Sequence, residues 1–313
     1  MAAAAAGGED EAGGEATRRS GTNGPPPGLL TLVATPIGNL GDLSPRALEA
    51  LRSADAVLCE DTRVTGALLA RHGVSVPLVP LHEHNEAAQV PRVIGRLAAG
   101  EKLALASDAG TPLMSDPGYR LVRAAIAAGL PVTAVPGPNA AVMAVTLSGL
   151  PPHPFLFVGF LPARAAARAA ELGGLRAAER AGLRATLVFY EAPHRLAEAL
   201  AAMAEALGGD RPAAVARELT KRFEEVRRGS LAELAAWYAR HEARGEVVVV
   251  VGPPAPEAPA GEAELDARLR EALAAGISVR DAAAAVAAAT GAARKAVYRR
   301  ALEIARAAAG KAG

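Results

Sequence analysis

The feature that most constrains the fold of this chain is a loop, S-D-A-G-T-P-L-M-S-D-P-G at residues 107–118, which directly follows the apolar run 102–106. An apolar run that ends abruptly in Asp, Gly and Pro is typical of a buried strand opening into an exposed loop, where α/β sheets bind their ligands. A second break of this kind follows Val135, in P-G-P-N-A. Because a helix-like segment separates the two, we expect both loops side by side at one sheet edge, where they would form a ligand crevice.

The sequence from residue 29 to residue 150 alternates short apolar runs with helix-like segments. The runs predict strands at 29–34, 56–59, 103–106 and 132–135. The segments predict helices at 45–51, 64–71, 87–98 and 119–127, and glycines stand at C-cap positions after three of them: Gly73, Gly100 and Gly129. This alternation is typical of a mostly parallel sheet covered by helices.

A proline-rich break, L-P-P-H-P at 150–154, leads into a second α/β domain. Strands are predicted there at 155–160, 185–190, 213–216, 223–228 and 247–251, and helices at 164–180, 194–207 and 231–241. A strand, a helix and then two consecutive strands indicate a mixed sheet. The predicted domains are therefore 29–150 and 151–253, preceded by a disordered tail at 1–28 and followed by a linker and a helix-turn-helix-like basic tail at 254–313.

Composition excludes several classes of protein. A hydrophobic share of 51% over 313 residues excludes a largely disordered chain, and a formal net charge of +1 leaves no overall footprint for nucleic acid, so any basic patch is local. The single cysteine cannot form an internal disulfide, no run approaches the ~20 apolar residues that span a bilayer, and residues 1–28 lack a signal-peptide core. These observations predict a cytoplasmic protein.

Three loops compete for the role of cofactor cradle: 35–43, 107–118 and 136–140. The first, T-P-I-G-N-L-G-D-L, has glycines that permit close backbone approach to a ligand. It lacks G-x-G-x-x-G and the Walker lysine, which disfavours a dinucleotide or a nucleoside triphosphate. Alone it would be an ordinary strand-to-helix turn, but three such loops exceed what connectivity needs.

Eight motifs follow one another between about Thr31 and Gly252: T-P-I-G-N-L-G-D-L-S-P-R-A-L, C-E-D-T-R-V-T, L-H-E-H-N-E, S-D-A-G-T-P-L-M-S-D-P-G, P-G-P-N-A, G-F-L-P, F-Y-E-A-P-H-R and A-R-E-L-T-K. In this order they closely resemble the ribosomal RNA small subunit methyltransferase I family, cytidine 2'-O-methyltransferases within the tetrapyrrole methylase superfamily. The superfamily's opening G-x-G-P-G-D loop corresponds to Ile37–Asp42, where Asn39 and Leu40 replace the Gly-Pro pair.

The resemblance implies an α/β protein with two α/β domains of tetrapyrrole methylase type, with the cofactor S-adenosyl-L-methionine in the inter-domain cleft, and a small helical C-terminal module. It further implies a homodimer that methylates the ribose of a cytidine in the decoding region of 16S ribosomal RNA, as RNA or within the 30S subunit. Two rivals stay open: a methyltransferase of the same fold acting on a tetrapyrrole or other small molecule, and a noncatalytic RNA-binding or ribosome-assembly protein.

The expected cofactor contacts lie in the three loops and at strand ends of the second domain. S-adenosylmethionine carries no phosphate, so a cradle without lysine is adequate, and loop amides can hold its carboxylate. Asp108 either accepts hydrogen bonds near the cation or ribose, or caps a turn. The expected contacts are Pro36, Gly38, Asn39, Ser107, Asp108, Ala109, Gly110, Thr111, Pro112, Leu113, Asn139, Ala140, Tyr190, Glu191 and Ala216.

The expected catalytic residues follow two strands. Arg63 suits a phosphate, and either Glu60 or Asp61 suits the proton of a ribose hydroxyl, unless the loop merely pairs its own charges. Lys221 either contacts RNA phosphate or depresses the pKa of the attacking hydroxyl, with an internal salt bridge to its neighbours as the alternative. The identity of the general base is left open.

The expected substrate contacts are polar and partly basic. His-x-His at 82–84 lacks a third ligand nearby, so we expect no metal. The resemblance implies that this segment belongs to the RNA-facing rim. Helix capping competes with RNA contact at residue 194. In the tail, basic residues predominate from residue 290 onward, and the helix that carries them, Arg300 included, either contacts RNA or packs against the body. The expected contacts are His82, His84, Asn85, His194, Arg195, Arg217, Arg294, Lys295 and Arg299.

Overall fold

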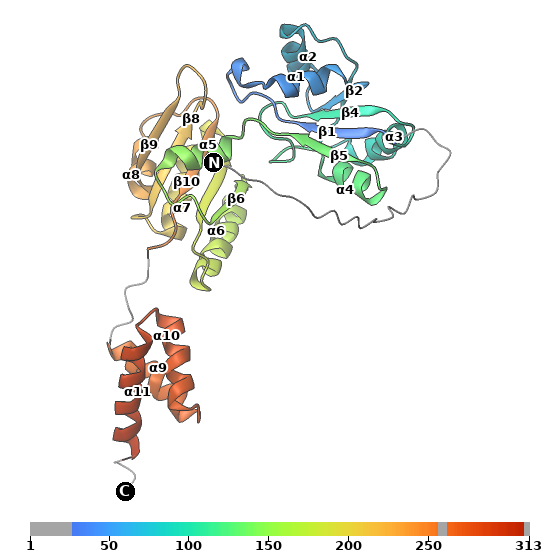
Figure 1. Ribbon diagram of the computed structural model, residues 1–313. Coiled ribbons are helices and arrows are strands. Elements are labelled where there is room, and N and C mark those ends of the chain that lie inside the picture. The colour runs from blue at the N-terminus through green and yellow to red at the C-terminus, as the bar shows by residue number, and fades with distance from the viewer. Residues whose placement is uncertain (1–26, 256–261, 310–313) are drawn as a thin grey trace, which may run out of the picture. The chain divides into compact units, whose positions relative to one another are not determined.

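The computed structural model describes residues 27–255 and 262–309 (Figure 1). The tail predicted at 1–28 and the linker predicted after residue 253 therefore lie largely outside the described residues. The chain divides into two compact units. One holds the described residues up to Met143 together with Glu218–Glu224, and the other holds Ala144–Arg217 and the described residues from Glu225 onward.

The first unit is built on a five-stranded sheet in which all pairs are parallel, as predicted. Its order is β3 (Leu78–Pro80), β2 (Ala56–Cys59), β4 (Lys102–Ala106), β1 (Leu29–Val33) and β5 (Val132–Val135). Strands β4 and β5 are not adjacent, because β1 lies between them. The loop that follows β1 therefore emerges between the loops that follow β4 and β5.

Helices cover both faces of this sheet. They are α1 (Pro45–Arg52), α2 (Thr62–Arg71), α3 (Glu86–Ala98) and α4 (Tyr119–Ala127), with a 3₁₀ turn at Leu40–Asp42. Leu97 of α3 and Leu121 of α4 pack against one face, and Leu51 of α1 and Leu69 of α2 against the other. Ser44 begins α1 by accepting the N–H of Ala47, and proline occupies the first helical position.

The second unit holds a mixed five-stranded sheet, also as predicted. Its order is β6 (Phe155–Phe160), β7 (Thr186–Glu191), β10 (Val247–Val251), β8 (Pro212–Arg217) and β9 (Glu225–Ser230), with only the first pair parallel. The other elements are α5 (Ala140–Ser148), which begins in the first unit, α6 (Ala165–Arg180), a 3₁₀ turn at Pro193–Arg195, α7 (Leu196–Leu207) and α8 (Leu231–Tyr238). The core of this unit contains Phe189 and Met203. It forms where alternate side chains of β7, β8 and β10 pack against the side chains of the helices.

The C-terminal residues form three helices around a small core of their own. These are α9 (Glu262–Ala274), α10 (Val279–Thr290) and α11 (Arg294–Ala309), and Leu269, Val286 and Val297 bury their side chains among them. Ser278 caps α10, and Gly291, at φ +66°, ends it. Arg300 makes two short hydrogen bonds, of 2.6 and 2.7 Å, to the Asp266 carboxylate. Arg300, which was predicted to belong to the basic face of α11, therefore holds α11 to α9 within the module.

Candidate active site

Three loops meet at the carboxyl edge of the first sheet. Thr35, after β1, exchanges both backbone hydrogen bonds with Gly110, at 2.9 and 3.1 Å, and its Oγ1 donates to the carbonyl of Ser107 at 3.0 Å. Thr111 Oγ1 donates to the carbonyl of Pro138 at 3.0 Å. The loops after β4 and β5 therefore contact one another in front of β1, although their strands are not adjacent.

The loop after β4 has a strained backbone. Leu113 and Ser115 have φ of +72° and +69°, and Gly110 and Gly118 are also positive, at +84° and +119°. A non-glycine residue held in the left-handed region costs about 1–3 kcal/mol, and such strain concentrates at ligand sites. A Cβ on Gly110 would lie 3.2 Å from Ile37 Cγ2, so glycine keeps this backbone close to the loop after β1.

Among the expected cofactor residues at this edge are backbone N–H groups that make no hydrogen bond and a carboxylate. The N–H groups of Ala109 and Thr111 make no hydrogen bond to any residue that the structure describes. Asp108 accepts the N–H of Asp61 at 3.1 Å, which ties the end of β2 to the loop after β4. Free amides suit the carboxylate of S-adenosylmethionine and a carboxylate suits its cationic side, so these residues fit the expected cofactor. Asn139 instead accepts the N–H of Val142 and begins α5.

A second strained loop, Glu218–Glu224, packs on the loop after β1 within the same unit. Thr220 Oγ1 accepts the N–H of Asn39 at 3.1 Å, and a Cβ on Gly38 would lie only 2.3 Å from Lys221 Cγ. Lys221 forms a salt bridge of 2.9 Å with Glu218, the alternative that the sequence left open. Glycine at position 38 is therefore required by the stem of Lys221.

Asp61 and Arg63 pair with each other. The Asp61 carboxylate begins α2 by accepting the N–H of Arg63 at 2.8 Å, and the guanidinium lies 2.6 Å away. These hydrogen bonds lower the pKa of Asp61 to about 2. The loop thus pairs its own charges, which is the alternative that the sequence left open for Arg63 and Asp61. Asp61 is therefore a weak proton acceptor.

Three other carboxyl groups at this edge influence one another. Burial and the negative charges of Glu60 and Asp108 raise the pKa of Asp116 to about 7. Desolvation also raises the pKa of Glu60, and the negative charge of Asp108 adds to this rise. The pKa of Asp108 is itself raised by desolvation, with a further contribution from the charge of Asp61. Asp116 was not among the expected site residues. The only signal for it was its place in S-D-P-G, which is also ordinary turn chemistry.

The histidine segment lies near this group. Asn85 accepts the N–H of His82 at 2.9 Å and donates to the carbonyl of Pro80 at 3.1 Å, so its side chain holds the turn. His82 is close enough to Glu60 to offset part of the rise in the pKa of that carboxyl. Its Nδ1 is buried without a hydrogen-bond partner among the described residues, and the His84 ring lies edge-on, 6.1 Å away between centroids.

The loop Glu218–Glu224 carries two further residues that the sequence analysis did not select. Phe223 is 67% exposed, and the Arg222 guanidinium carbon lies 5.6 Å from the centroid of its ring. A large exposed aromatic beside a cation is typical of surfaces on which nucleotide bases stack.

The expected site residues of the second unit lie on β7, β8 and the turn after β7. Tyr190 and Ala216 flank Val248 in one row across the sheet, on the face opposite Phe189. Glu191 is buried and forms an ion pair of 3.2 Å with Arg195, so these two side chains partner each other. Arg217 pairs with Glu225 at 3.2 Å, and the side chain of His194 is exposed in the 3₁₀ turn.

The expected substrate residues of the tail, Arg294, Lys295 and Arg299, are exposed on α11. Within residues 27–255 and 262–309, no three of His, Cys, Asp and Glu gather in the manner of metal ligands. None of the helices described is long and apolar enough to cross a membrane.

Two family models match the chain. Tetrapyrrole (Corrin/Porphyrin) Methylases matches residues 29–235, and RsmI C-terminal HTH domain matches residues 259–305. The chain is 52% identical over 277 residues to a ribosomal RNA small subunit methyltransferase I of Mesorhizobium japonicum, covering 88% of this chain and 92% of that protein. It is 47% identical over 281 residues to the protein of the same name from Pseudomonas aeruginosa, covering 88% and 97%.

Solved structures share the fold. A diphthine synthase matches with a TM-score of 0.56 at 19% identity, over 72% of this chain and 90% of that one. A uroporphyrin-III-C-methyltransferase from Thermus thermophilus matches with a TM-score of 0.50 at 25% identity, over 72% and 94%. The two sheets with their helices thus have the architecture of tetrapyrrole methylases.

Proposed function

This chain belongs to the tetrapyrrole methylase family and, within it, to the ribosomal RNA small subunit methyltransferase I family, and from this membership we propose that it transfers a methyl group from S-adenosylmethionine to the ribose 2'-oxygen of a cytidine in the decoding region of 16S ribosomal RNA. The observation that carries the proposal is the strained loop after β4, whose free N–H groups and neighbouring carboxyls meet the loops after β1 and β5.

Some residues at this edge bind the cofactor in this proposal, and others accept the proton of the ribose hydroxyl. S-adenosylmethionine, when bound, would supply an electrophilic methyl group, which the ribose oxygen attacks in line while the methyl–sulfur bond breaks and the sulfur leaves as a thioether. The N–H groups of Ala109 and Thr111 would hold its carboxylate, and Asp108 would face its cationic side. The chain contributes mainly by positioning, because in-line transfer needs the two reacting atoms aligned.

The proton of the ribose hydroxyl goes to the carboxylate of Asp116 in this proposal. A general base works best when its pKa lies near the working pH, and the pKa of Asp116 is about 7. Asp61, at about 2 and bound by Arg63, is a poorer choice. Glu60 has a raised pKa and lies close enough to influence Asp116, so it tunes this group or substitutes for it.

The substrate side is polar and cationic. The Arg63 side chain is 89% exposed and suits an RNA phosphate, and Phe223 with Arg222 offers a stacking surface in the same unit. We further propose that the protein acts in the cytoplasm, as a homodimer, on the small ribosomal subunit or its RNA. The names of the relatives support the RNA substrate.

Methyl transfer to undermethylated 30S subunits tests the proposal. With isotopically labelled cofactor, we expect label in a single cytidine, and nuclease digestion should recover it as a 2'-O-methylated nucleoside. Naked 16S RNA and a uroporphyrinogen serve as parallel substrates. Label in the uroporphyrinogen and not in RNA would favour the tetrapyrrole rival, and failure to bind the cofactor in calorimetry would favour a noncatalytic protein.

A further inference from the structure

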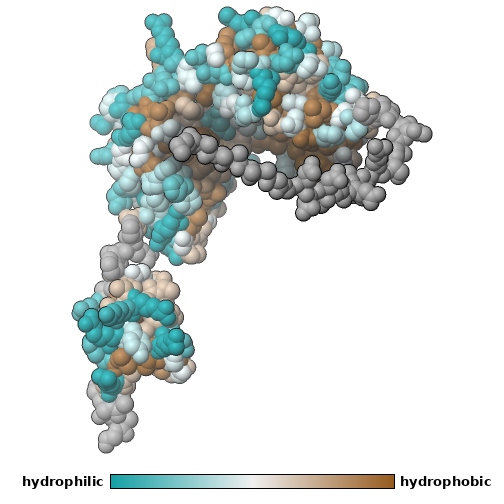
Figure 2. Space-filling view, in the orientation of Figure 1, coloured by the Kyte–Doolittle hydropathy of each residue, from teal (hydrophilic) through white to brown (hydrophobic). Residues whose placement is uncertain are grey.

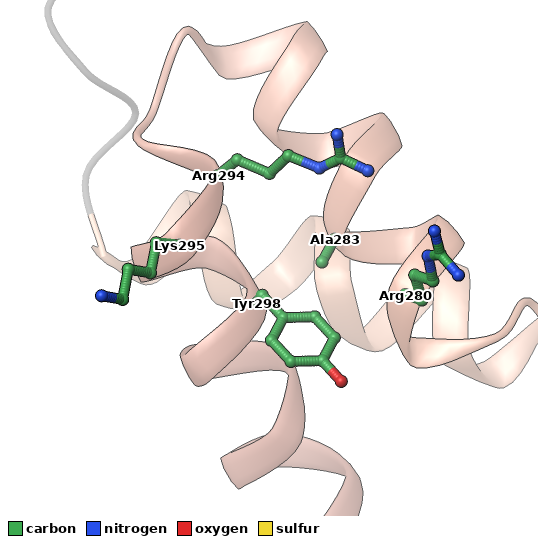
Figure 3. A pocket seen from close by; sticks show the side chains of 5 residues that line it. All are labelled: Arg280, Ala283, Arg294, Lys295 and Tyr298. Atoms are coloured by element: carbon green, nitrogen blue, oxygen red, sulfur yellow. The ribbon is translucent and has the colours of Figure 1, made fainter.

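The C-terminal module has an open groove between α10 and α11 (Figure 3). Arg280 and Ala283 line it from α10, and Arg294, Lys295 and Tyr298 line it from α11, around a volume of about 470 Å³. Figure 3 shows the Arg294 side chain extending toward the helix that carries Ala283, while the Lys295 ammonium points away from the others at the rim. Its volume falls within the ~300–1,000 Å³ typical of ligand pockets.

The charge of this groove is not compensated. Three of its five lining residues are cations and none is an acid. Among the described residues, Arg280, Arg294 and Lys295 form no ion pair, and hydrophilic residues cover much of the face of the module seen in Figure 2. Three other arginines of the module are paired, in Arg268–Glu264, Arg270–Asp266 and Arg300–Asp266, whereas Arg299 and Arg306 are not paired with a described residue. The groove therefore gathers three uncompensated cations around one cavity, which suits an anion.

Tyr298 adds a stacking surface to these cations. Tyr298 is 43% exposed, while Ala283 beneath the groove is buried. Unpaired RNA bases stack on aromatic rings of this kind, and arginine and lysine bind the adjoining phosphates. A helix cannot read the deep, narrow major groove of A-form RNA as it reads DNA, so a single-stranded segment is the form of RNA that fits here.

We propose that the groove between α10 and α11 binds one phosphodiester and the neighbouring unstacked base of a single-stranded RNA segment. Arg280 and Arg294 contact the phosphate, and Tyr298 stacks on the base. The proposal rests on the proposed function, because it assigns the module a part of the RNA substrate. It adds Arg280 and Tyr298 to the expected RNA surface and removes Arg300 from it.

Binding of two ligands to the full-length protein tests the assignment. One is a fluorescent ten-residue oligocytidylate, and the other is inorganic polyphosphate of matched charge, which has no bases. Tyr298→Ala should weaken oligocytidylate binding about five- to tenfold and leave polyphosphate binding unchanged, because this variant removes only the stacking surface. Arg280→Gln should weaken both and reduce the slope of log affinity against log salt by about 0.7 for each phosphate that the protein no longer neutralises.

Two variants control for indirect effects. Tyr298→Phe keeps the ring and should bind like wild type, and Arg268→Gln removes a paired cation from α9 and should change neither ligand's affinity. Unchanged oligocytidylate binding by Tyr298→Ala and Arg280→Gln would overturn the proposal, as would equal weakening of both ligands in Tyr298→Ala. If wild type methylates 30S subunits in that case, only the groove is refuted. If the variants behave as expected and no methyl transfer occurs, the proposed function fails and the RNA groove remains.

Discussion

In the proposed mechanism a single carboxyl group, that of Asp116, sets the response of the reaction to pH. Its pKa of about 7 means that the carboxylate form increases as the pH rises through neutrality. We expect Asp116→Asn to reduce kcat by about 10²-fold or more, the usual contribution of a general base, and to abolish the rise in rate near pH 7. S-adenosylmethionine affinity, measured by calorimetry, should stay near wild type. An unchanged pH profile in the variant would assign the proton to another group.

The same shift predicts a pH-dependent stability. The pKa of Asp116 is higher in the folded state, about 7, than the reference value of 3.8, so between these values the folded protein binds more protons and its stability falls as the pH rises. Asp116→Asn should therefore raise the melting temperature at pH 8 by roughly a few degrees and leave it near wild type at pH 4. Asp61→Asn is the matched control with the opposite sign. Its pKa is lowered to about 2, so removing this carboxylate should lower the melting temperature at pH 7.

Gly110 is the residue that tests the cofactor loop. Its φ is +84° and a Cβ would lie 3.2 Å from Ile37 Cγ2, so valine would strain the backbone and push the loops apart. We expect Gly110→Val to lose most cofactor affinity in calorimetry while circular dichroism stays native. Gly129→Ala, at φ +68° with open space around it, controls for backbone strain away from the loops. Native affinity in a folded Gly110→Val would exclude this loop from the cofactor site.

Which residues the sequence could identify depended on local chemistry. Ser44, Gly73 and Gly291 were predictable because caps follow from neighbouring residues. Asp116 was not, because burial by distant residues decides its pKa. The sequence also offered Asp61 as a base, but only the structure shows that Arg63 holds it as an anion.

At the scale of elements, the loop Glu218–Glu224 is the part of the β8–β9 connection that packs with the first unit. Its exposed Phe223 predicts a role in holding RNA. Phe223→Ala should raise KM for 30S subunits about five- to tenfold without changing cofactor affinity, because base stacking contributes mainly to substrate binding. Phe223→Trp should retain the wild-type KM. Equal KM values for the alanine variant and wild type would exclude stacking at this position.

The elements that sequence analysis missed share a physical reason. Strand β3 is three residues long and ends in Pro80, too short for a two-residue period. Helix α5 is apolar on every side, so it has no amphipathic period to detect. By contrast, the β1, β4 and β10 strands were predictable as continuous apolar runs, although the order that places β1 between β4 and β5 is a property of the sheet.

At the scale of the whole molecule, the edge strands of the sheets are candidate surfaces for dimer formation. Strand β6 is the last strand of the second sheet, so one side of its backbone lacks a neighbouring strand within that sheet. Phe155, Leu156 and Phe160 on this strand are 44%, 37% and 52% exposed. Exposed apolar edge strands are either aggregation hazards or interfaces, and the proposed homodimer would cover this one.

The oligomeric state tests that use of β6. Light scattering at micromolar concentration should give twice the 31.7 kDa of one chain. Phe155→Lys places a charge on the exposed edge and should shift the mass to that of the monomer, because desolvating the ammonium opposes association. Phe223→Lys, on another exposed phenylalanine, should leave the dimer intact. A monomeric wild type would refute the dimer, and a dimeric Phe155→Lys would place its interface away from β6.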